Sequence, residues 1–146
     1  MRVLRLIMAL PAAAALAACG SARDFSTSPS QEQCTTLATG ATCPPSSTLT
    51  YASFGQTFFG TYCTRCHGST VTGDARHGAT VGVNFDTLDG IKAHVCTIDS
   101  FAGSGPNGTF TFMPFDITSL NPDPPQVFPT VEERVQLSQW IACGTP

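Results

Sequence analysis

Two cysteines and a histidine stand together in the segment Cys-Thr-Arg-Cys-His, residues 63–67. On a helix, Cys63 and Cys66 are about one turn apart, so both thiols reach the same edge of a planar ligand. This C-x-x-C-H arrangement is the pattern of covalent c-type haem attachment, in which the thiols add to the two vinyl groups of the haem. The imidazole of His67 then lies beneath the iron as the proximal ligand. The segment therefore predicts one covalently bound haem c.

The same segment has three other interpretations. A structural disulfide between the two cysteines is the simplest. A zinc site needs a second pair of ligands at short spacing, and no such pair follows in the sequence. A thioredoxin-like redox pair needs a β-α-β context, and the sequence shows no such pattern. Haem attachment fits the surrounding residues better than any of these.

The N-terminus predicts export. A short basic stretch precedes an apolar run that ends in small residues, and the run is too short to span a bilayer comfortably, for which about 20 apolar residues are needed. Its end, Leu-Ala-Ala-Cys-Gly, resembles the lipobox of bacterial lipoproteins. We therefore expect residues 1–18 to be a lipoprotein-type signal peptide and Cys19 to be lipidated, on the periplasmic side of a bacterial membrane. Cleavage to a free exported protein is the alternative, and Gly20 mildly favours the outer membrane by resemblance.

The remaining cysteines suit an oxidising compartment. Of seven cysteines, Cys19 and the haem-binding pair leave four. These four can form two disulfides in three ways, and export favours their oxidation. We favour the pairs Cys34–Cys43 and Cys96–Cys143, of which the first would close a small loop and the second would join two helices.

Three helices are expected, over residues 53–66, 87–96 and 130–144. The first has Ser53 and Gln56 as a capping box, and its aromatic residues recur at helical spacing. Thr87 is the cap of the second. Thr130 and Glu133 form a second capping box at the start of the third helix.

The rest of the chain predicts loops. Residues 19–50 are rich in Ser, Thr, Ala and Gly, so we expect a flexible linker, with residues 51–146 as the folded domain. More than thirty residues between the second and third helices are rich in Gly and Pro. A compact domain seldom carries so long a loop without a function. The expected fold class is all-α: a small domain of about three helices around one haem, with long Gly/Pro-rich loops and an N-terminal tether.

Together these features resemble the class I, monohaem cytochromes c. Gly55 and Phe59 precede Cys63 at the spacing of the family's Gly-x-x-x-Phe/Tyr-x-x-x-Cys run. Residues 133–140, ERVQLSQW, match the Glu-Arg-x-x-Leu-x-x-aromatic pattern of its last helix. The resemblance covers the expected domain. It implies that these two helices cross closely at the glycine, and that Phe59, Tyr62 and Trp140 shield the haem.

The resemblance also implies a second axial ligand, usually methionine. Met113 is the one methionine beyond the signal peptide, and it lies in the long loop with Pro114 after it. We therefore expect Met113 to be the distal ligand. A thioether ligand stabilises ferrous iron and raises the reduction potential relative to bis-histidine ligation. His77 and His94 are the competing ligands.

The loop after the proximal histidine has a further expected role. In the family, a carbonyl about twelve residues after that histidine, usually of a proline, accepts the ring N–H and orients the ligand. Counting from His67 leads to Ala79, whose carbonyl is the expected acceptor. Arg76 is expected at the surface, with a haem propionate as its alternative partner.

The expected function is electron transfer between redox partner proteins by a haem protein tethered to the membrane through its lipid anchor. With His67 and Met113 filling both axial positions, catalysis is not expected. The chain has 7 basic and 10 acidic residues, which speaks against a nucleic-acid partner. One alternative is a haem-based ligand-binding or peroxidatic domain with an open distal site. The other is a disulfide-rich lipoprotein without haem.

Overall fold

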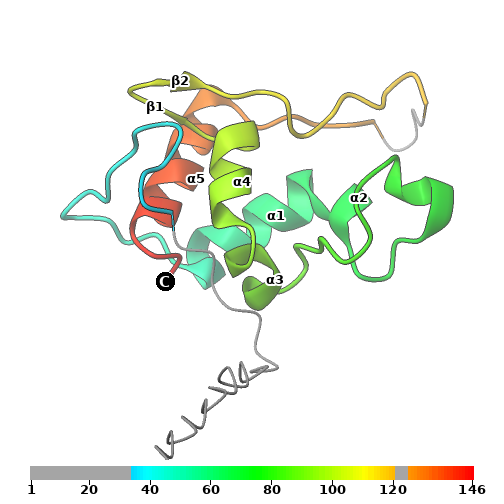
Figure 1. Cartoon of the computed structure of the whole chain (residues 1–146), viewed down its shortest axis with the longest axis horizontal. Helices are drawn as coiled ribbons and strands as arrows, with labels where there is room; N and C mark the ends of the chain where they lie inside the picture. The colour runs from blue at the N-terminus through cyan, green and yellow to red at the C-terminus, as the bar shows by residue number, and fades with distance from the viewer. Residues whose placement is uncertain (1–33, 121–124) are drawn as a thin grey trace, which may run out of the picture.

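A computed structural model describes residues 34–120 and 125–146 (Figure 1). The expected signal peptide, Cys19 and the first part of the expected linker lie outside these residues. The elements are, in chain order, the π-helical turn η1 (Tyr51–Gly55), α1 (Gln56–Tyr62), α2 (Thr64–His67), the 3-10 turn η2 (Gly73–Arg76), α3 (Leu88–Lys92), α4 (Val95–Ala102), β1 (Ser104–Gly105), β2 (Gly108–Thr109) and α5 (Val131–Ala142). No helix of the described part is long and apolar enough to cross a membrane.

The first helical segment begins earlier than expected. The hydroxyl of Thr50 accepts from the backbone N–H of Ser53, and the hydroxyl of Ser53 accepts from the N–H of Thr50. This capping box replaces the expected pair of Ser53 and Gln56, because the chain already turns at Tyr51 and needs its cap one residue before. The segment continues through α1 and α2 as far as His67.

The second expected helix is divided in two. Thr87 caps α3 by accepting from the N–H of Gly90, as the sequence predicted. The backbone then leaves helical geometry at His94, and α4 carries the chain on to Ala102. Three apolar side chains of α4, those of Val95, Ile98 and Ala102, are buried. Their packing explains why the helical region extends beyond the expected end at Cys96.

The third helix, α5, is confirmed. Its cap is the predicted box of Thr130 and Glu133, and Gly144 follows its end with a positive φ of 83°. That conformation favours glycine and stops the helix.

A two-stranded antiparallel sheet was not expected. In it Ser104 pairs with Thr109 and Gly105 with Gly108. Strands of two residues show no alternating pattern in the sequence, so the expected all-α class did not include them. This hairpin occupies the start of the long Gly/Pro-rich segment.

The hydrophobic core lies where α1, α4 and α5 meet. Figure 1 shows α4 beside α5, with α1 running past them toward α2. The indole of Trp140 is fully buried, and its ring contacts those of Phe54 and Phe59. A Cβ atom built on Gly55 would lie 3.0 Å from Cζ2 of Trp140, so a larger residue here would push the indole or the ring of Tyr51 back by a few tenths of an ångström.

Residues 34–50 are part of the folded domain, which differs from the expected flexible linker. Disulfides join Cys34 to Cys96 and Cys43 to Cys143, so the favoured pairing of Cys34 with Cys43 and of Cys96 with Cys143 is wrong. The segment runs across α4 and α5, and each of its cysteines therefore meets a helix rather than the other. Between them the buried Thr39 donates from its N–H and its hydroxyl to the buried carboxylate of Asp99.

Candidate functional site

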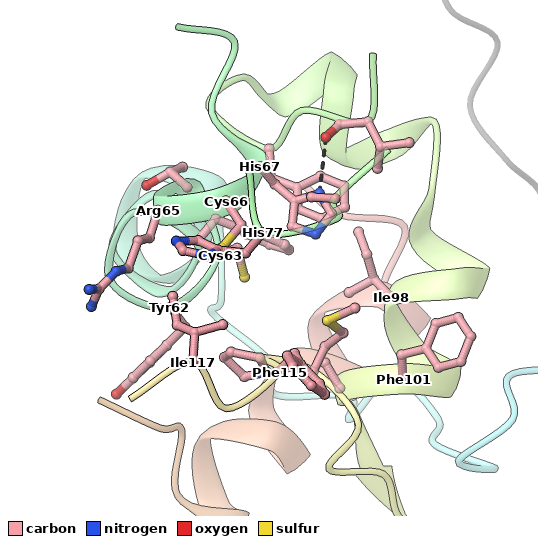
Figure 2. Close-up of a pocket in the computed structure, with 18 of the residues that line it drawn as sticks. Tyr62, Cys63, Arg65, Cys66, His67, His77, Ile98, Phe101, Phe115 and Ile117 are labelled. Atoms are coloured by element: carbon pink, nitrogen blue, oxygen red, sulfur yellow. Dashed lines mark hydrogen bonds between the residues drawn. The ribbon is translucent and has the colours of Figure 1, made fainter. Parts of the chain in front are cut away.

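A cavity of about 1050 Å³ opens beside the core. Its walls come from α1 and α2, from the loop after α2, from α4 and from the long loop before α5. Its volume is slightly above the range of roughly 300–1,000 Å³ that is usual for small-molecule and cofactor sites. Figure 2 shows Cys63, Cys66 and His67 on one side of the central space, facing Ile98, Phe101, Phe115 and Ile117.

Two free thiols lie on the cavity wall. Cys63 stands at the junction of α1 and α2, and Cys66 follows within α2. The other four cysteines of the described chain are in disulfides, whereas these two are free. Burial raises the pKa of Cys63 to about 12 and also raises the pKa of Cys66. Both thiols are therefore protonated at neutral pH, which does not suit a thiolate nucleophile or a redox-active pair.

The ring of His67 is held in one orientation. Its Nδ1–H donates to the carbonyl of Val83 over 3.0 Å, the dashed line of Figure 2. The ring stacks on Phe85, with ring centroids 4.6 Å apart. Burial is the main cause that lowers the pKa of His67, so the imidazole is neutral at neutral pH. Nε2 then carries a lone pair, and no described residue hydrogen-bonds it.

The carbonyl that accepts from His67 is not the expected one. It belongs to Val83, 16 residues after the histidine, whereas the carbonyl of Ala79 accepts from Nε of Arg76. The loop is longer than the family spacing implies, because it includes the turn η2 and glycines at positive φ such as Gly78 and Gly82. The expected surface position of Arg76 is also wrong, since only 5% of this residue is exposed.

Met113 lines the cavity from the long loop. Its N–H donates to the carbonyl of Phe101 over 2.9 Å, and its own carbonyl accepts from Nη1 of Arg134 over 2.8 Å. These bonds fix the backbone of Met113 between α4 and α5. The two competing ligands, His77 and His94, line the same cavity.

The expected shielding residues divide between the cavity and the core. Phe59 and Tyr62 line the cavity. Trp140 does not, because it lies behind Phe59 in the core with its ring centroid 6.1 Å from that of Phe59. Its role is to support the wall rather than to form it.

The described residues contain no group of three or more His, Cys, Asp or Glu side chains placed to hold a metal ion. The zinc interpretation of residues 63–67 therefore gains no support. The arrangement offers two protonated thiols for covalent attachment, one neutral imidazole for coordination and a thioether on the facing loop.

No protein-family model, curated protein or solved structure matches this chain. A function must therefore be argued from the residues of the cavity.

Sequence reasoning did not foresee the role of Val83, whose carbonyl orients His67, or the burial of two arginines, Arg76 in the cavity wall and Arg134 behind it. A carbonyl leaves no signal in a sequence, and the burial of an arginine depends on tertiary packing. The only available hint was the absence of a proline from the loop after His67.

Proposed function

We propose that this protein binds one c-type haem covalently in the cavity and transfers single electrons between redox partner proteins. The observation that carries the proposal is the grouping of the two free thiols, Cys63 and Cys66, with an imidazole whose Nε2 is unpartnered among the described residues. All three line one cavity of about 1050 Å³. A haem, when bound, supplies reversible one-electron chemistry at its iron.

Cys63 and Cys66 would hold the cofactor. Each thiol would be held to the haem by adding across one vinyl double bond, with the sulfur bonded to one carbon and the thiol hydrogen to the other. The addition neither consumes nor releases electrons, so it needs no oxidant. The raised pKa values of both thiols fit this role, because the protein keeps them protonated and out of disulfides.

His67 and Met113 would be the axial ligands. The Val83 carbonyl directs Nδ1–H of His67 away from the cavity, which leaves Nε2 for the metal. Met113 comes from a different wall, where Arg134 holds its carbonyl. If the protein supplies both ligands, no site for a substrate would remain at the metal, so we propose an electron carrier rather than an enzyme.

The apolar wall would exclude water from the cofactor. Phe58 and Phe59 are 4% and 1% exposed, and Ile98 and Ile117 are 6% and 1% exposed. An apolar, dry environment would disfavour the ferric form, which carries one more positive charge than the ferrous form. Thioether ligation would favour ferrous iron in the same direction.

We also propose that the protein is exported and held at the periplasmic side of a membrane by lipidated Cys19, with the outer membrane preferred. The two disulfides support export, since such bonds persist in oxidising compartments. The segment from Cys34 to Thr50 packs on the domain through both disulfides.

Haem staining after denaturing electrophoresis tests the attachment, with the full chain expressed alongside haem-maturation machinery. Wild type should keep its stain, and the Cys63→Ser/Cys66→Ser double variant should lose it. Cys43→Ala/Cys143→Ala is the matched control, because it also removes two cysteines but leaves the cavity wall intact, and it should keep the stain. An unstained wild-type protein would overturn the proposal. Binding of carbon monoxide to the reduced protein would favour the alternative, a ligand-binding or peroxidatic domain with an open distal site.

A further inference from the structure

Arg76 is a buried cation whose hydrogen bonds all go to one loop. Its guanidinium donates to five backbone carbonyls and one side-chain amide oxygen, at 2.8–3.1 Å: those of Gly68, Val71, Ala79, Thr80 and Val83, and Oδ1 of Asn84. A guanidinium has five N–H donors. Six acceptors therefore use all of them, and none remains for a cofactor propionate.

Apart from Arg76, the loop between residues 68 and 84 is held by short backbone turns and by two contacts at its ends, from the N–H of Phe85 to the carbonyl of His67 and from Ser69 to Asp86. It contains no proline and only the short turn η2, and Gly73, Gly78 and Gly82 adopt positive φ. The chain at such glycines has large conformational freedom when unfolded. The hydrogen bonds of Arg76 reach both ends of the loop. Gly68 is its first residue, directly after α2, and Asn84 is its last. Arg76 therefore connects the middle of the loop to both of its ends.

One carbonyl is shared between the arginine and the histidine. Val83 accepts from Nη2 of Arg76 and from Nδ1 of His67, each over 3.0 Å. A carbonyl oxygen has two lone pairs, so both bonds can form together. A cation on that oxygen withdraws electron density from it, which weakens its acceptance from the imidazole.

We propose that Arg76 is a positioning residue for His67, which fixes the Val83 carbonyl and limits how strongly that carbonyl polarises the imidazole. The proposal rests on the proposed function in so far as His67 is a metal ligand. A strong acceptor at Nδ1 makes the imidazole more basic and stabilises the oxidised metal. By weakening the acceptor, and by adding a buried positive charge, Arg76 raises the reduction potential of the centre.

Two variants separate the geometry from the charge. Arg76→Met removes both the donors and the charge at similar length, whereas Arg76→Lys keeps the charge but offers three donors without the planar fork. Lys92→Met is the control, since it removes a positive charge from α3, which does not line the cavity. If Arg76→Met does not fold, Arg76→Lys still reports the loss of geometry.

The first measurement is hydrogen exchange of the Val83 and Ala79 amides, which report how firmly the loop under His67 is held, by NMR on the full chain. In both Arg76 variants these protons should exchange at least about tenfold faster than in wild type. The loop opens more readily once the charge-assisted hydrogen bonds of the guanidinium are lost. Lys92→Met should not. Unchanged exchange in both Arg76 variants would overturn the positioning role.

The second measurement is the midpoint potential of the haem-loaded protein. It should fall in Arg76→Met, fall less in Arg76→Lys and change least in Lys92→Met. A potential in Arg76→Met equal to or above that of wild type would overturn the electronic part of the proposal. If wild type binds no haem, the proposed function fails, but the exchange measurement still decides whether Arg76 positions His67.

Discussion

The phenolic hydroxyl of Tyr62 donates a hydrogen bond of 2.8 Å to Oε1 of Glu133. Tyr62 is the last residue of α1 and lines the cavity, while Glu133 stands in the first turn of α5. The other carboxylate oxygen of Glu133 accepts from the N–H and the hydroxyl of Thr130. One carboxylate therefore caps α5 and joins it to the helix that leads into residues 63–67.

Loss of this carboxylate should change how stability depends on pH. The hydrogen bonds from Thr130, with that from Tyr62, lower the pKa of Glu133 in the folded protein. Because the pKa of Glu133 is lower in the folded than in the unfolded protein, its ionised carboxylate stabilises the fold at pH values above the unfolded-state pKa of about 4.3. This contribution is lost as the pH falls through the folded-state pKa. Glu133→Gln should therefore flatten the fall in stability below about pH 4.3, as measured by denaturant unfolding at a series of pH values.

The neighbouring Glu132→Gln is the matched control, because Glu132 is exposed in the same turn. It should alter the profile less than Glu133→Gln does. Equal effects of the two substitutions would show that the contacts of Glu133 with Thr130 and Tyr62 contribute nothing specific.

Arg134 should be essential for the segment that carries Met113. Its Nη1 donates to the carbonyls of Ala102, Phe110 and Met113, at 2.8–3.0 Å, and the residue is buried. Arg134→Met would leave these carbonyls without their donor, at a cost of about 3 kcal/mol in the free energy of unfolding. Guanidinium denaturation measures it. A loss no larger than that of Lys92→Met would contradict this role.

Disulfide mapping should find Cys34 linked to Cys96 and Cys43 linked to Cys143. Proteolysis without reduction, followed by mass spectrometry, identifies the linked peptides. Removing the first pair as Cys34→Ala/Cys96→Ala should lower the free energy of unfolding by about 2–5 kcal/mol, because the bond closes a long loop. A peptide in which Cys34 is linked to Cys43 would disprove the observed arrangement.

Met113→Leu tests the distal ligand. Leucine has a similar volume but no sulfur, so the covalent haem should remain while its sixth ligand is lost. The reduced variant should bind carbon monoxide, and the oxidised variant should lose the weak far-red band of sulfur-to-iron charge transfer. His77→Ala and His94→Ala are the controls and should keep that band. If Met113→Leu has the wild-type spectrum, one of the two histidines is the ligand.

The sequence best predicted the features that depend on residues close together in the chain. Thr87 and the pair of Thr130 and Glu133 were identifiable as caps, because a cap and the N–H that donates to it lie only three residues apart. The sequence also identified Met113, through the family resemblance, as the distal ligand; the structure has it on the cavity wall, and its ligation stays a prediction.

Contacts between distant segments were not predictable in this way. The disulfide partners depend on the path of residues 34–43 across α4 and α5, and no local sequence pattern indicates that path. The acceptor of the His67 proton is the carbonyl of Val83 and not that of Ala79, which accepts from the buried Arg76 instead. A single sequence shows the arginine but not its burial.

The most direct test of the central claim is an absorption spectrum of the full-length protein, oxidised and then reduced, after expression with haem-maturation machinery. A low-spin c-type spectrum with the weak far-red sulfur-to-iron band is expected, from one haem ligated by His67 and Met113. A low-spin spectrum without that band would transfer the distal role to His77 or His94, and a high-spin spectrum would mean an open distal site. A purified, folded protein with no haem absorption would contradict the assignment of this cavity as a haem site.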